Sequence, residues 1–114
     1  MKAQVQIISN ENKEIINVDN IVNNKDFEYI DSYGANNHLL VFDNGIEIKR
    51  VCNSHNTLLH LMKNEDSYVI IDSIEGNVKI SSKVLAFDIN CDIISLVYLI
   101  NSEQRKIIVK YLGD

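Results

Sequence analysis

Short alternations of apolar and polar residues recur along the chain, separated by turns rich in Asn, Asp and Gly. Side chains of a strand point alternately to two faces, so a period of two predicts half-buried β-strands. Turn residues at such short intervals are typical of a sandwich or barrel. The pattern predicts strands over Gln4–Ser9, Glu14–Val22, Phe27–Ile30, Leu39–Phe42, Ile46–Val51, Tyr68–Asp72, Asn77–Ser82, Lys83–Asp88, Asp92–Ile100 and Lys106–Leu112.

The segment Thr57–Lys63 is compatible with two kinds of secondary structure, a short helix and a strand. Its apolar residues fall at helical spacing, and Thr57 is a suitable helix cap. The segment is nevertheless shorter than the ~12 residues at which helices become stable. A strand and a short helix therefore both stay open for this segment.

The clearest local turn signal is Asp43-Asn44-Gly45, between two predicted strands. Asn and Gly both accept the positive φ angles of a type I′ turn, whose twist matches that of a hairpin. The sequence therefore predicts a tight hairpin with Asn44 and Gly45 at the central turn positions.

Composition supports a sheet throughout the chain. Isoleucine and valine make up about a quarter of the residues, and β-branched side chains pack well on a pleated surface. Proline is absent, so every strand residue can donate its backbone N–H to a neighbouring strand. The 114 residues, 46% hydrophobic and 24% charged, suffice for one core and exclude disordered and low-complexity classes. We therefore expect a single all-β domain over residues 1–114.

The formal net charge of −5 argues against nucleic-acid binding, because an acidic surface repels phosphates rather than releasing their counterions. The same sign disfavours adsorption to anionic membranes. The longest apolar run, Ile93–Ile100, falls far short of the ~20 residues that a membrane helix needs. The start of the chain is too polar for a signal peptide. We expect a cytoplasmic protein that binds neither nucleic acid nor membrane.

Cysteine and histidine side chains supply few options for chemistry. Cys52 and His55 have C-x-x-H spacing, and His60 follows five residues later. Zinc needs three or four convergent ligands, and neither Cys91 nor His38 lies at a matching spacing. Nothing in the sequence orients a base beside Cys52 for nucleophilic catalysis. We therefore expect two reduced thiols, no metal or cofactor, and no catalytic residue.

The predicted strands near the end of the chain are apolar on both faces. A solvated antiparallel sheet is polar on its outer face, and the sequence offers no long helix to cover this one. Either a β-sandwich buries both faces internally, or a second copy of the chain or another protein covers the outer face. In the second case the expected interface residues are Ile94, Leu96, Ile100, Ile108 and Leu112.

Four short patterns follow one another between about Tyr33 and Leu112. They are a strand ending in arginine, a tyrosine-to-glycine stretch, a short connecting strand and an apolar-x-Tyr strand end: Ile46-Glu47-Ile48-Lys49-Arg50, Tyr68 with Glu75-Gly76-Asn77-Val78, Lys83-Val84-Leu85 and Ile93-Ile94-Ser95-Leu96-Val97-Tyr98. In their order and spacing they resemble the YwiB-like family, small bacterial β-barrels of the calycin type without an assigned biochemical role. None of the four patterns is a catalytic signature.

The resemblance implies an all-β, mainly antiparallel barrel of calycin or lipocalin type, complete or flattened, with about eight to ten strands. Barrels of this type often hold small apolar ligands. The leading hypothesis is therefore a non-enzymatic binding module for a small amphipathic or anionic molecule. The alternative is a protein-interaction or homodimerising protein that uses the apolar outer face of the C-terminal strands.

Arg50 is the most informative polar side chain. It shares the parity of Ile46 and Ile48 along its strand, so we expect it to point toward the barrel interior or mouth. Burying an arginine without a partner is costly. The functional hypothesis is that Arg50 anchors a ligand carboxylate or phosphate, with Tyr68 and Tyr98 at the same polar end. The alternative is a structural ion pair, or a strand end that emerges into solvent.

Overall fold

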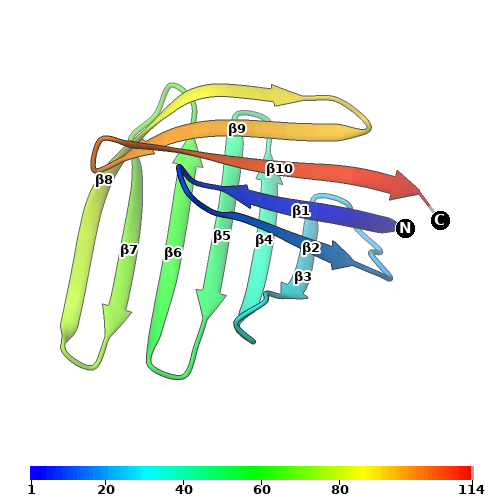
Figure 1. Cartoon of the computed structure of the whole chain (residues 1–114). Coiled ribbons are helices and arrows are strands. Elements are labelled where there is room, and N and C mark those ends of the chain that lie inside the picture. The colour runs from blue at the N-terminus through cyan, green and yellow to red at the C-terminus, as the bar shows by residue number, and fades with distance from the viewer. Residues whose placement is uncertain (114) are drawn as a thin grey trace.

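The chain folds into one continuous antiparallel sheet. A computed structural model describes residues 1–113, and every regular element within them is a β-strand, so no helix is present that could span a membrane. The ten strands in this range are β1 (Lys2–Ile8), β2 (Lys13–Val18), β3 (Asp26–Ile30), β4 (Asn36–Phe42), β5 (Gly45–Val51), β6 (His55–Met62), β7 (Ser67–Ser73), β8 (Gly76–Ile89), β9 (Ile93–Ile100) and β10 (Glu103–Gly113). Neighbouring strands follow the order β2-β1-β10-β9-β8-β7-β6-β5-β4-β3 (Figure 1). The predicted all-β barrel is confirmed, with β2 and β3 forming the seam of a nearly closed barrel.

Strand β8 carries the sheet around a corner. Its residues 76–82 pair with β7, and its residues 82–89 pair with β9. A β-bulge between Val84 and Ala86 interrupts the second ladder, and a bulge bends its strand and increases the local twist. The prediction of two strands, Asn77–Ser82 and Lys83–Asp88, is therefore wrong, because the chain bends there without reversing direction.

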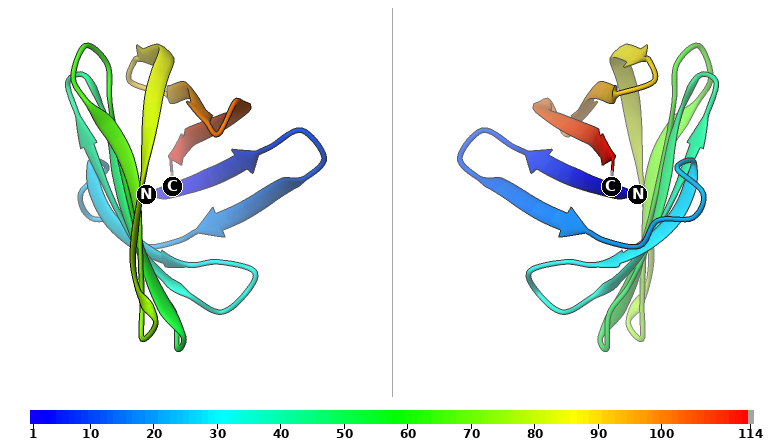
Figure 2. Two further views of the ribbon diagram at one scale, coloured as in Figure 1. Left: turned by 90° about the vertical axis from the view of Figure 1, so that its left-hand side faces the viewer. Right: turned by 90° about the vertical axis from the view of Figure 1, so that its right-hand side faces the viewer.

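The bend in β8 creates two layers. Strands β1, β2, β9 and β10 run across the direction of β3–β7 (Figure 1). Seen from the side, they lie over one face of the β3–β7 layer (Figure 2). The inner faces of the two layers are thereby brought together, and this is where the core forms.

The segment Thr57–Lys63 proves to be a strand over most of its length. Strand β6 runs through Met62 and pairs with β5 on one side and β7 on the other. Backbone hydrogen bonds to two neighbours outweigh the helical spacing of its apolar residues, since tertiary pairing routinely overrides local propensity.

The hairpin between β4 and β5 differs from the predicted one. Phe42 pairs with Gly45, so the two-residue loop is Asp43-Asn44, and neither loop residue has a positive φ angle. A Cβ atom on Gly45 would overlap the carbonyl oxygen of Leu61 and lie 2.8 Å from the Cα atom of Met62. The close approach of β6, and not the turn, therefore requires glycine at this position.

Two consecutive positive φ angles, the mark of a type I′ turn, occur in the hairpin between β9 and β10. Asn101 and Ser102 have φ angles of 49° and 67°, and Ile100 pairs with Glu103 across the turn. The predicted turn type is thus present in the chain, but at a different hairpin.

The core fills the space between the two layers. Its most buried large side chains are Tyr98, Leu39, Ile46, Leu61, Ile94, Leu96, Ile107, Val5 and Val109. Ile94, Leu96 and Ile100 are only 1%, 0% and 8% exposed, so their assignment to an outer interface is wrong. Both faces of β9 are apolar, so the sequence alone does not show which face turns inward.

The outer face of β9 and β10 is mixed rather than uniformly apolar. Ile108 lies on this face beside Ser95, while Lys106 is paired with Val97 and Lys110 with Ile93. Each apolar residue in these pairs thus has a polar neighbour opposite it, because the lysines of β10 lie opposite Val97 and Ile93, and Ser95 lies opposite Ile108. Leu112, near the end of β10, is 57% exposed.

Candidate functional site

The interior of the barrel is hollow at one end. There β1, β3, β5, β7 and β9 finish and the other five described strands begin. Two open pockets of about 360 and 270 Å³ lie at this end, and Leu59 of β6 lines both of them. The larger pocket has an apolar wall of Ile7, Ile16, Ile48 and Leu59. Its polar residues are Glu14, Tyr29, Asp31, Tyr33, Asn37 and Arg50.

Arg50 points into the larger pocket, as its parity on β5 predicts, and it has a carboxylate partner. Its Nε atom donates a hydrogen bond to Asp31 Oδ2 at 2.7 Å, and the two side chains are 24% and 6% exposed. The alternative of a structural ion pair is thus realised. The two terminal Nη groups of Arg50 have no hydrogen-bond partner within residues 1–113, and they remain available to a ligand.

Asp31 holds the polar side of this pocket together. Its Oδ1 atom accepts the backbone amides of Tyr33 and Ala35 at 3.0 and 3.1 Å, and its Oδ2 atom accepts Asn37 Nδ2 at 3.0 Å. Burial by itself raises the pKa of Asp31, but the hydrogen bonds from Arg50, Asn37 and the two amides outweigh burial and lower the pKa to about 2. The hydrogen bond to Asp31 in turn raises the pKa of Arg50. Both groups are therefore charged at neutral pH.

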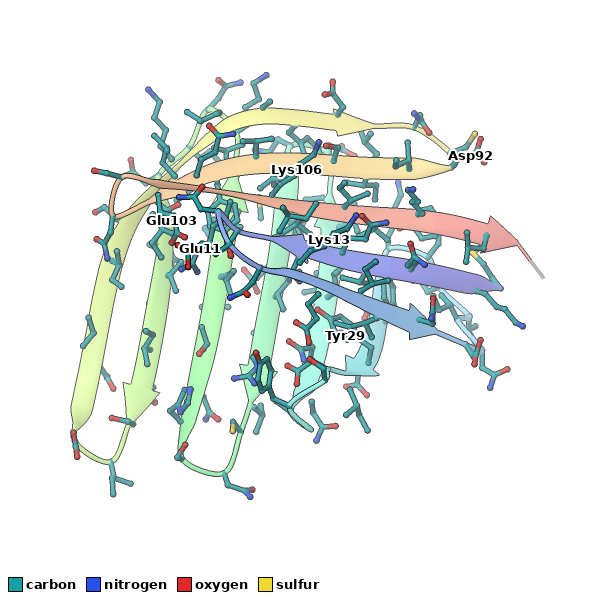
Figure 3. The ribbon with its side chains drawn as sticks, viewed as in Figure 1. Glu11, Lys13, Tyr29, Asp92, Glu103 and Lys106 are labelled. Atoms are coloured by element: carbon teal, nitrogen blue, oxygen red, sulfur yellow. The ribbon has the colours of Figure 1, made fainter. Side chains whose placement is uncertain are left out.

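Glu14 and Tyr29 lie on β2 and β3, the two strands that border the seam, and both line the larger pocket. Glu14 Oε2 accepts hydrogen bonds from the backbone amide, at 2.9 Å, and the hydroxyl of Ser32. Tyr29 extends from β3 into the space between the layers (Figure 3). Burial raises the pKa of Tyr29, and the negative charges of Asp31 and Glu14 raise it further. Both side chains are polar groups of the larger pocket.

Glu14, Tyr29 and Asp31 were not among the site residues predicted from the sequence. Glu14 shares the parity of the buried residues Ile16 and Val18 on β2, so the reasoning applied to Arg50 would have found it. Tyr29 has the same relation to Phe27 on β3. Asp31 lies just past the end of β3, but it continues the parity of Phe27 and Tyr29 and is buried like them.

The smaller pocket contains a second arginine–carboxylate pair at the start of β10. Arg105 Nη2 and Nε donate to Glu103 Oε2 at 2.8 and 3.0 Å. Burial is the largest single influence on the pKa of Arg105 and lowers it, but the interactions with Glu103 and Tyr98 together outweigh burial and raise the pKa. Tyr98 also lines this pocket, and burial raises its pKa. The structure thus brings Arg50 and Tyr98 to the same end of the barrel, in adjacent pockets.

Tyr68 does not lie with Arg50 at the polar end, and this part of the prediction is wrong. Its ring stacks on His60 at a centroid distance of 4.8 Å, with Lys79 Nζ 4.5 Å from the ring centre. His60 Nδ1 is in turn 2.8 Å from Glu47 Oε2. These residues lie on the outer face of the sheet, because the alternation of side chains along β7 turns Tyr68 away from the side on which Val69 is buried.

The remaining candidates do not converge. Cys52 and Cys91 are free thiols. Within residues 1–113, no three His, Cys, Asp or Glu side chains are grouped so that they could hold a metal ion. His55 Nδ1 lies 2.9 Å from the hydroxyl of Ser54, and His38 Nε2 lies 2.5 Å from Asp26 Oδ1. These histidines therefore interact with separate neighbours, each close by in the fold.

No protein-family model and no curated protein sequence matches the chain. Its structure is similar to the crystal structure of the YwiB protein from Bacillus subtilis, with a TM-score of 0.59 and 13% sequence identity. The match covers 99% of this chain and 89% of that chain. At such low identity the likeness establishes the fold and carries no function. The resemblance to the YwiB-like family is thus confirmed at the level of the fold: residues 1–113 form a nearly closed ten-stranded barrel that is similar to the YwiB structure.

Proposed function

We propose that the protein is a binding module that reversibly holds a small amphipathic molecule in the larger pocket. The observation that carries this proposal is an apolar pocket of about 360 Å³ with open hydrogen-bonding groups along one side. Binding sites for small molecules are typically apolar concavities of ~300–1,000 Å³ with a few convergent polar groups. The pocket lies at the low end of that range, which suits a ligand with a short apolar part.

The arrangement of the pocket also favours binding because its polar side is already ordered. Asp31 fixes the orientation of the Arg50 guanidinium through the Nε bond and fixes the loop after β3 through two backbone amides. A ligand that meets the Nη groups therefore does not have to order them, which reduces the entropic cost of binding. The apolar wall opposite, which includes Ile48 and Leu59, gains from the removal of its surface from water.

A probe of the pocket tests this proposal. N-phenyl-1-naphthylamine is uncharged, and its fluorescence increases in apolar surroundings. We expect a saturable increase with the wild-type protein, and at least about tenfold weaker binding to Leu59→Trp, because the larger ring occupies the pocket. Leu58→Trp is the matched control. Leu58 is the neighbouring residue of β6, is also half-buried, and faces the other side of the sheet.

The urea midpoint of each variant should be measured alongside, so that lost binding is not confused with unfolding. The proposal fails if the wild-type protein gives no saturable signal. It also fails if folded Leu59→Trp and Leu58→Trp bind the probe equally well.

Self-association through the outer face of β9 and β10 has less support. Lys106 and Lys110 are interspersed among the apolar residues of that face, and charged residues are depleted from the centres of stable interfaces. Sedimentation at micromolar concentration tests this alternative, which requires a dimer.

A further inference from the structure

We propose that the larger pocket selects an uncharged head group that both donates and accepts hydrogen bonds, and that Glu14 excludes anions from it. This inference rests on the proposed function, and it specifies the chemistry of the ligand. The sequence alone suggested an anionic ligand, because it showed Arg50 but not the carboxylates beside it. An uncharged head group replaces that anionic ligand in the present proposal.

The charges around the pocket argue against an anion. One cation, Arg50, and two carboxylates, Asp31 and Glu14, line it. Asp31, 2.7 Å from Arg50, already neutralises the guanidinium. The Glu14 carboxylate therefore leaves the pocket with one negative charge in excess. A ligand carboxylate would add a third negative charge to a partly desolvated site, where like charges repel strongly.

The unused hydrogen-bonding groups of the same residues fit a head group that has both a donor and an acceptor. The Nη groups of Arg50 can donate to a ligand oxygen. Glu14 uses its Oε2 atom for Ser32, and its other oxygen has no partner within residues 1–113, so it can accept from a ligand N–H or O–H.

The hydroxyl of Tyr29 adds a third open group. Tyr29 is 7% exposed, and no partner of its hydroxyl occurs within the described residues. Within the described residues, no side-chain N or O atom is both fully buried and without a hydrogen-bond partner. The Tyr29 hydroxyl, which has no partner among these residues, is therefore not fully buried. It therefore opens into the pocket that Tyr29 lines, where it can donate to or accept from a ligand.

Two compounds with the same alkyl chain test the selection. Octanamide and octanoate should be compared as competitors of N-phenyl-1-naphthylamine at pH 7.5. Any apolar pocket prefers the uncharged compound, so the decisive readout is the change of preference in Glu14→Gln. The amide oxygen of the substituted side chain could still accept from Ser32, but the charge would be gone. We expect octanoate to bind roughly tenfold more tightly to this variant, with octanamide changed less than about twofold.

Glu11→Gln is the matched control, because Glu11 is exposed in the loop before β2 at the same end of the molecule (Figure 3). Octanoate binding that is equal in wild type and Glu14→Gln, or equally improved by Glu11→Gln, overturns the inference and leaves the pocket intact. Octanoate that outcompetes octanamide on the wild type also overturns it. Failure of the probe itself to bind overturns the proposed function instead.

A measurement on the wild type keeps the inference testable if Glu14→Gln does not fold. Raising the salt concentration from about 0.02 to about 0.5 M screens the partly exposed Glu14 charge. The affinity of octanoate should then approach that of octanamide. A ratio of the two affinities that does not change with salt overturns the inference.

Discussion

The Nε atom of Arg50 lies 2.7 Å from Oδ2 of Asp31, and this bond joins the end of β5 to the loop between β3 and β4. Asp31 Oδ1 meanwhile accepts the amides of Tyr33 and Ala35 from that loop. One carboxylate thus holds both the guanidinium and the backbone that form the polar side of the larger pocket. The Arg50–Asp31 pair therefore both stabilises the fold and positions the guanidinium of Arg50 in the pocket.

Asp31→Asn should destabilise the barrel by about 2–3 kcal/mol, because it removes the carboxylate charge that is hydrogen-bonded to the partly buried Arg50. The free energy of unfolding in urea at pH 7 measures this. Asp43→Asn is the control, since Asp43 is exposed in the β4–β5 loop, and it should change stability by less than about 0.5 kcal/mol. Equal effects of the two substitutions would contradict the role of Asp31.

The contribution of Asp31 should also depend on pH. Its pKa is about 2 in the folded protein against an ordinary value of 3.8, so the ionised form stabilises the native state. This stabilisation is fully present above about pH 5 and is lost as the pH falls toward about 2. The difference in unfolding free energy between wild type and Asp31→Asn should therefore shrink over that range. A difference that stays constant down to about pH 2.5 would show that the charge is not its source.

Gly45→Ala should destabilise the protein by roughly 3 kcal/mol or more, because the added Cβ atom meets the backbone of β6 at Leu61 and Met62. Gly34→Ala provides the comparison. Gly34 has a φ angle of +84° with no atom within 4 Å of an added Cβ, so only backbone strain of about 1 kcal/mol is expected. Thermal or urea unfolding of both variants distinguishes a steric requirement from a conformational one.

Ser102→Gly should stabilise the barrel by about 0.5–1 kcal/mol, since Ser102 has a φ angle of 67° in the β9–β10 turn and glycine adopts that conformation without strain. Asp43→Gly is the opposite control. Asp43 has no positive φ angle, so glycine there only adds freedom to the unfolded chain and should destabilise by a similar amount. If Asp43→Gly stabilised the protein more than Ser102→Gly did, the turn assignment would be wrong.

The position of a site residue was predictable where it depended on strand parity. Arg50 follows Ile46 and Ile48 at intervals of two, and the period of a strand requires that all three face one side. The same logic, applied to Tyr68, required knowledge of which face of β7 turns inward. Tyr68 lies outside because the adjacent Val69 is the buried residue.

Local sequence patterns were enough to predict that the chain is all-β, where most strands lie, and that Arg50 faces inward. These properties follow from local periodicity and from β-branched composition. The three-dimensional structure was needed to show which face of the largely apolar β9 is core, that β8 bends at a bulge rather than ending, and that Asp31 and Glu14 line the same pocket as Arg50. These depend on register between strands that are distant in sequence, and a one-residue change of register exchanges the two faces of a strand.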